Sequence, residues 1–222
     1  MNIRSTLSNL LFMIAAVTFG AAAPAADLRQ LVQKVDQKYN RLHTLETQFT
    51  EIYQGGGMDR TESGTLLLKK PGKMRWEYRS PREKLFLSDG RDAWFYLPGE
   101  RQVRKSSMKK LDDLRSPLGF LLGKTRLEKE LQGLSFAPDV APLNQGDYVL
   151  RGVPQGLADR VSQVLLEVSP EGRIDRIILQ QADGAVTEYR FSGQKEDVPV
   201  ADAFFHFDPP AGTEVVEGEL GQ

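Results

Sequence analysis

Hydrophobic and polar side chains alternate strictly from Lys73 to Arg79, in the middle of the chain. Met74, Trp76 and Tyr78 fall on one side of this alternation, and charged residues fall on the other. Successive side chains of a β-strand point to opposite faces of its sheet. The pattern therefore predicts a sheet with one apolar, aromatic face and one charged face that contacts solvent.

Comparable short segments recur along most of the chain and are separated by glycine- and proline-containing turns such as Pro71-Gly72 and Asp89-Gly90. Few of these segments are joined by anything longer than a turn, which favours antiparallel pairing. We expect a mainly β (α+β) fold, an unclosed antiparallel β-barrel of about eleven strands. Further expected strands are Leu45–Gln54, a strand carrying Leu66 and Leu68, Arg101–Lys105, Tyr148–Arg151, Val164–Val168, Ile174–Gln180, Val186–Ser192 and, last, Ala203–Phe207.

Two regions have helical periodicity instead. Asp27 is a suitable N-cap for an amphipathic helix that ends at Arg41. A helical insertion is expected near residues 107–133, where Thr125 and Glu128 form a capping box for a helix bearing Leu127, Leu131 and Leu134. Before it, Ser116 and Pro117 begin a short helix that is apolar almost all round. Such a short helix is not stable alone, so we expect it to cover the sheet as a lid. The lid residues are Leu118, Phe120, Leu121 and Leu122.

The apolar side chains of the predicted sheet allow two interpretations. They could form an ordinary core against a second sheet, or they could line a cavity for acyl chains. Bulky aromatic residues and a methionine suit an adaptable apolar site, and the short apolar helix suits a lid, so we favour the cavity. The expected cavity residues are Phe49, Leu66, Leu68, Met74, Trp76, Tyr78, Phe86 and Trp94.

The N-terminal segment is typical of a secretory signal peptide spanning residues 1–25. Arg4 supplies a positive charge, Leu10–Val17 is apolar, and Ala23-Pro24-Ala25 is a small-x-small cleavage site. The apolar run is shorter than the roughly 20 residues of a membrane-spanning helix. We expect a soluble periplasmic protein made of one domain, residues 26–222, that is monomeric and, lacking cysteine, is stabilised by its core alone.

Composition argues against several functional classes. The formal net charge of −1 gives no reason to expect a nucleic-acid partner. The chain holds two histidines, His43 and His206, and neither lies in a recognisable motif. The sequence has no G-x-S-x-G motif, metal-ligand cluster or phosphate-binding loop. We therefore expect no catalytic residue, metal site or cofactor, and not an enzyme.

Several motifs together resemble the LolA family, the periplasmic carriers of bacterial outer-membrane lipoproteins. They are G-x-L-x-L-K-K-P-G-K-M-R-W-E-Y-x-x-P from Gly64, S-D-G-x-x-x-W-F-Y from Ser88, S-P-L-G-F-L-L from Ser116 and F-H-F-D-P-P-A-G from Phe205. Each motif alone is weak evidence, but their order along nearly the whole chain after residue 25 is specific.

The resemblance implies a shuttle without reaction chemistry. It would take acylated lipoproteins from an inner-membrane ABC-type lipoprotein-releasing transporter and pass them to an outer-membrane lipoprotein receptor. Family members often carry arginine at the position of Lys70, where it helps to latch the lid, so Lys70 is the latch candidate here, although lysine cannot make the same forked contact. The alternatives are a carrier of another lipid, an envelope-stress sensor with the same half-barrel and a lipid-modifying enzyme.

Overall fold

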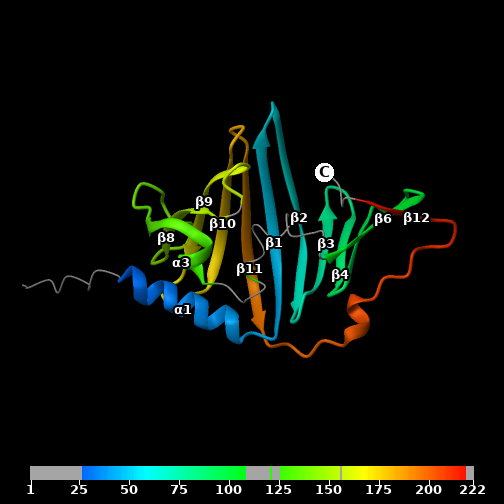
Figure 1. The fold of residues 1–222 in the computed structure, drawn as a ribbon, viewed down its shortest axis with the longest axis horizontal. Coiled ribbons are helices and arrows are strands. Elements are labelled where there is room, and N and C mark those ends of the chain that lie inside the picture. The colour runs from blue at the N-terminus through cyan, green and yellow to red at the C-terminus, as the bar shows by residue number, and fades with distance from the viewer. Residues whose placement is uncertain (1–26, 109–120, 122–125, 156, 219–222) are drawn as a thin grey trace, which may run out of the picture.

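The structure, a computed structural model, describes residues 27–108, 121, 126–155 and 157–218. These residues form a twelve-stranded sheet in the order β12-β6-β5-β4-β3-β2-β1-β11-β10-β9-β8-β7, with β12 and β7 at its two edges (Figure 1). The expectation of a mainly β fold with an unclosed sheet is confirmed. The strands are β1 (Thr44–Gly55), β2 (Met58–Lys69), β3 (Lys73–Ser80), β4 (Lys84–Asp89), β5 (Asp92–Tyr96), β6 (Gln102–Ser107), β7 (Leu131–Phe136), β8 (Tyr148–Pro154), β9 (Val161–Val168), β10 (Ile174–Gln181), β11 (Val186–Glu196) and β12 (Glu214–Glu217).

Most neighbouring strands pair antiparallel through hairpins, whereas β12 pairs parallel with β6. The predicted last strand, Ala203–Phe207, is wrong. Asp202–Phe205 forms a 3-10 helix, η3, and the last strand of the described chain is β12. Side chains of β2 and β3 hold η3 in place of a strand ladder: Lys69 and Lys73 pair with Asp202 at 2.7 and 2.6 Å, and Arg75 donates to the Phe204 carbonyl.

The predicted second helix of the insertion is also largely wrong. The helix there, α3 (Leu127–Glu130), has four residues, and Leu131 and Leu134 belong to β7. Pairing with β8, which places Leu131 opposite Pro154, outweighs the local helical periodicity. The N-cap of α3 is Arg126, without a side-chain cap, and Thr125 of the expected capping box lies outside the described residues.

Helix α1 (Leu28–Arg41) agrees with the prediction. The Asp27 carboxylate accepts a hydrogen bond from the Arg29 amide, as an N-cap does. The helix buries an apolar stripe against one end of the sheet (Figure 1), and the Tyr39 hydroxyl accepts a hydrogen bond of 2.9 Å from the amide of Ile174. The buried residues of α1 are Leu31, Val32, Val35 and Tyr39.

The main core lies on the face of the sheet that carries Leu66 and Trp76, which we call the inner face. It joins side chains of α1 to inner-facing residues of the strands from β3 round to β7. The opposite, outer face has a smaller apolar cluster around Leu165 and Ile178. Beside that cluster, the buried Glu167 and Arg176 form an ion pair of 2.7 Å.

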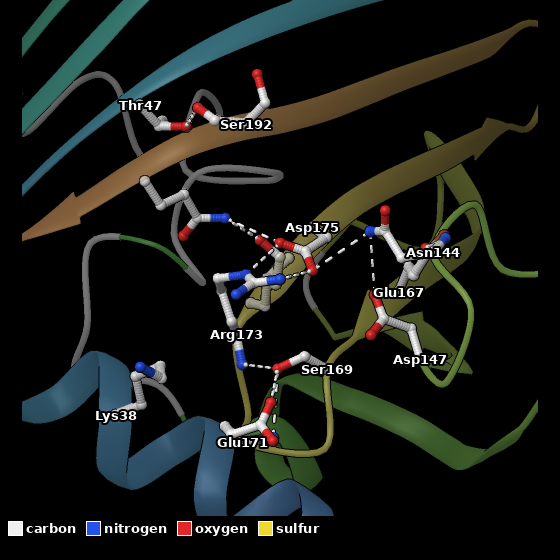
Figure 2. A network of polar contacts seen from close by, with 12 residues as sticks. Lys38, Thr47, Asn144, Asp147, Glu167, Ser169, Glu171, Arg173, Asp175 and Ser192 are labelled. Carbon is white, nitrogen blue, oxygen red and sulfur yellow. Dashed lines mark hydrogen bonds and ion pairs between the residues drawn. The ribbon is translucent and has the colours of Figure 1, made fainter.

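Polar contacts fix the turn between β9 and β10 next to α1 (Figure 2). The Ser169 hydroxyl accepts hydrogen bonds from the amides of Glu171 and Arg173, and the Arg173 guanidinium forms two hydrogen bonds to Asp175, of 2.6 and 2.8 Å. Lys38 of α1 pairs with Glu196 of β11 at 2.6 Å. This charge-assisted pair joins α1 to β11 and so helps to hold the helix at one end of the inner face.

Candidate functional site

The inner face of β1, β2 and β3 carries a continuous apolar wall. Strand register places Leu66 opposite Trp76 and Leu68 opposite Met74, and all four side chains are buried. Phe49 of β1 joins them. The structure therefore brings together most of the residues that the sequence assigned to a cavity, although a cavity function for them remains a prediction.

Aromatic rings dominate one part of this wall. The Trp76 ring stacks on Tyr78 at 5.3 Å between centroids and meets the edge of Phe49 at 5.3 Å. Tyr189 of β11 approaches Trp76 at 5.7 Å. Sequence reasoning did not include Tyr189 in the site, although the alternation of Thr187, Tyr189 and Phe191 placed it on one face of a strand.

Phe86 and Trp94 lie on opposite faces of the sheet. Phe86 is directly across from Trp76 and belongs to the inner face, as expected. Trp94 is across from Leu87, one residue out of phase, and its ring faces Phe207 on the outer side at 6.4 Å. The assignment of Trp94 to the cavity wall is therefore wrong, because a shift of one residue moves a side chain to the other face.

The inner face also carries a polar cluster next to the aromatic rings, which sequence reasoning missed. Glu51 and Glu62 are direct cross-strand neighbours and are both buried. The Tyr78 hydroxyl donates a hydrogen bond of 2.7 Å to Glu51, while Lys84 and Arg60 pair with Glu62 at 2.6 and 3.0 Å. The sequence signal was the alternation that places Glu51 two residues after Phe49 on the same face.

Burial dominates the electrostatics of this cluster. It raises the pKa of Glu51, and the neighbouring Glu62 carboxylate raises that pKa further, against the hydrogen bond from Tyr78. Burial also raises the pKa of Tyr78 and of Tyr189, so both phenols keep their protons. The cluster thus offers a buried carboxylate that ionises with difficulty beside neutral phenol groups.

Lys70 lies at the end of the wall next to α1. Its side-chain nitrogen donates hydrogen bonds to the backbone carbonyls of Tyr39 and Asn40, and its partial burial lowers its pKa. Lys70 therefore caps the C-terminus of α1, and its role as a latch for the lid remains a prediction. Leu121 is buried and lines the same small depression as Lys70 and Leu68. Leu118, Phe120 and Leu122 lie outside the described residues.

No cluster of His, Asp and Glu suited to a metal ion occurs among the described residues. His43 lines a surface depression. There the Asp197 carboxylate accepts hydrogen bonds from the backbone amides of His43 and Thr44. These hydrogen bonds lower the pKa of Asp197. The helices that the structure describes include none with the length and apolarity needed to span a membrane.

The sequence of this chain is similar to those of several known proteins. The family described as "Outer membrane lipoprotein carrier protein LolA" matches residues 40–208. An outer-membrane lipoprotein carrier protein from Proteus mirabilis is 27% identical over 208 residues, covering 93% of this chain and 96% of that protein. One from Nitrosospira multiformis is 30% identical over 159 residues, covering 71% and 73%.

A solved structure has the same fold. It is an uncharacterized conserved protein from Thermus thermophilus, with a TM-score of 0.56 and 13% sequence identity, covering 86% of this chain and 98% of that one. At this identity the similarity concerns the fold alone.

Proposed function

This chain belongs to the LolA family of outer membrane lipoprotein carrier proteins, and from this premise we propose that it carries acylated lipoproteins to the outer membrane. The family match covers more than half of the chain. In this role the protein binds and releases a cargo and catalyses no reaction, as is typical of a carrier.

The observation that supports this proposal most strongly is the apolar inner wall formed by Leu66, Leu68, Met74, Trp76 and Phe49. Burying an acyl chain is worth about 0.8 kcal/mol per methylene group. Full recovery of that energy from several chains would exceed the roughly 20 kcal/mol at which affinities saturate. A carrier must also release its cargo, so protein groups should occupy the wall when cargo is absent. α1 and Leu121, both packed in the same core, supply such groups.

The route of the cargo follows from the same premise. The protein would act in the periplasm after removal of residues 1–25, which lie outside the described residues. It would receive lipoproteins from an ABC-type transporter of the inner membrane and deliver them to a receptor in the outer membrane. These locations and partners are parts of the proposal.

A solution transfer assay tests the proposal. Purified protein is incubated with detergent-free vesicles that contain a diacylated lipoprotein, and the vesicles are then removed by centrifugation. We expect part of the lipoprotein to move from the vesicles into the supernatant, in a complex with the protein. The control is the same lipoprotein with its acylated cysteine replaced by serine; it has no membrane anchor, is added in solution, and should not co-elute with the protein.

Two results would contradict the proposal. One is equal binding of the acylated and unacylated lipoproteins, which would mean that the acyl chains are not recognised. The other is purification of the protein from cells with free lipid and no acylated protein, identified by mass spectrometry. That second result would support a carrier of another lipid.

A further inference from the structure

The indole nitrogen of Trp76 is a buried hydrogen-bond donor that has no partner within the described part of the chain. Trp76 is 9% exposed, and its Nε1 atom has no acceptor among the residues that the structure describes. Buried polar groups in proteins nearly always have a partner, so an unpaired donor requires an explanation. An N–H of indole can only donate, so the missing partner must be an acceptor.

The side chains around Trp76 fix the ring but do not satisfy the donor. Phe49 lies nearly perpendicular to the ring, with an angle of 77° between the two planes, and Tyr78 stacks on it. The Tyr78 hydroxyl donates to Glu51 at 2.7 Å and does not accept a hydrogen bond from the indole. The ring is therefore held on the inner face by packing, while none of the described residues accepts a hydrogen bond from its N–H.

Trp76 lies where the inner face changes from apolar to polar. On one side of it along β3 is Met74, paired with Leu68. On the other side is Tyr78, paired with Lys84, whose ammonium lies over the phenol ring at 4.1 Å. An acylated glycerol has the same order of polarity, with hydrocarbon first, then an ester carbonyl, then a polar head group.

We propose that Trp76 Nε1 donates a hydrogen bond to an ester carbonyl oxygen of the diacylglycerol group on the bound lipoprotein. This inference rests on the proposed carrier function and adds a specific polar subsite to it. The acyl tails lie toward Leu68 and Met74, where no acceptor is needed. The polar head group lies toward Tyr78 and Lys84. The ester carbonyl is the first acceptor that follows the hydrocarbon, so it reaches the indole at the boundary.

Two lipopeptides separate this contact from apolar binding. Both carry the same fluorescent peptide on a glyceryl cysteine, one with ester-linked chains and the other with ether-linked chains of equal length, which lack the carbonyl oxygens. We expect the wild-type protein to bind the ester about five-fold more tightly, which corresponds to about 1 kcal/mol, the size of one net hydrogen bond.

A pair of matched variants assigns the preference to one residue. Trp76→Phe keeps an aromatic ring but removes the donor. This variant should bind the ester and ether lipopeptides with about equal affinity. Trp94→Phe makes the same change on the outer face and should keep the five-fold preference. Circular dichroism confirms that each variant is folded.

NMR of the two indole N–H groups provides a second measurement that needs no variant, because the chain has two tryptophans. The Trp76 signal should move downfield with the ester lipopeptide and not with the ether, while the Trp94 signal should stay in place. Equal binding of both lipopeptides by the wild type, or an unchanged preference in Trp76→Phe, would overturn the proposed contact and leave the carrier function intact. Failure of both lipopeptides to bind would instead contradict the carrier function itself.

Discussion

The side-chain nitrogen of Lys70 donates a hydrogen bond to the backbone carbonyl of Tyr39, in the last turn of α1. The last carbonyls of a helix have no partner within the helix, and a positive charge near them is favourable. The contact joins the loop after β2 to α1, so it links the apolar wall to the helix that covers one end of it.

Replacement of Lys70 should weaken this link. Lys70→Met keeps the length of the side chain but leaves the carbonyls of α1 without their donor, and we expect a loss of about 1–2 kcal/mol in the free energy of unfolding. Lys70→Arg retains a charged donor and should stay within about 0.5 kcal/mol of the wild type. Urea unfolding measures both. Equal stability of Lys70→Met and the wild type would show that the contact contributes nothing.

Leu121 should affect both stability and cargo release. It is 2% exposed in the main core, so Leu121→Ala should cost about 2–5 kcal/mol. If Leu121 competes with the cargo for the apolar wall, the variant should also release a bound acylated lipoprotein more slowly. Leu127→Ala is the matched control, since Leu127 is equally buried in α3 and should reduce stability without slowing release. Stopped-flow release that is unchanged or faster in Leu121→Ala would argue against the competition.

Ionisation of Glu51 should reduce stability as the pH rises. Burial raises its pKa above the ordinary value of 4.5, so the folded protein holds this proton more tightly than the unfolded chain does. Stability therefore falls as the pH rises from about 4.5 through the raised pKa. Glu51→Gln preserves an acceptor for Tyr78 and cannot ionise, so relative to the wild type it should gain stability across this interval. Chemical unfolding at several pH values checks this, and a difference that does not vary with pH would contradict it.

Gly64 should tolerate no side chain. A Cβ atom at this position would lie 1.8 Å from the backbone carbonyl oxygen of Glu77 on the neighbouring strand. Gly64→Ala must therefore push β2 and β3 apart, at an expected cost of about 3 kcal/mol or more. Gly218→Ala is the control, because a Cβ there meets nothing within 4 Å. Thermal unfolding of the two variants should differ clearly, and similar midpoints would mean that the strands separate easily at Gly64.

Much of the local structure could be predicted from the sequence. The alternation of Met74, Trp76 and Tyr78 fixed β3 and its inner face, because the two-residue period of a strand acts within the segment itself. The apolar stripe of α1 and its Asp27 cap are likewise local features. The same two-residue period predicted the candidate wall. Leu66 and Leu68 alternate in the same way on β2, and they lie opposite Trp76 and Met74 of β3.

Tertiary structure alone decided which segments met and on which side. Leu131 and Leu134 have helical spacing, but pairing with β8 makes them part of a strand. Trp94 is a bulky aromatic residue like those of the apolar wall, but the register of β4 and β5 places it on the outer face. The opposition of Glu51 and Glu62 depends on the neighbours that the fold supplies, and so does the lack of an acceptor for the Trp76 indole among the described residues. Periodicity within one segment specifies which residues share a face, whereas partners, register and burial are set by free energies summed over strands far apart in the chain.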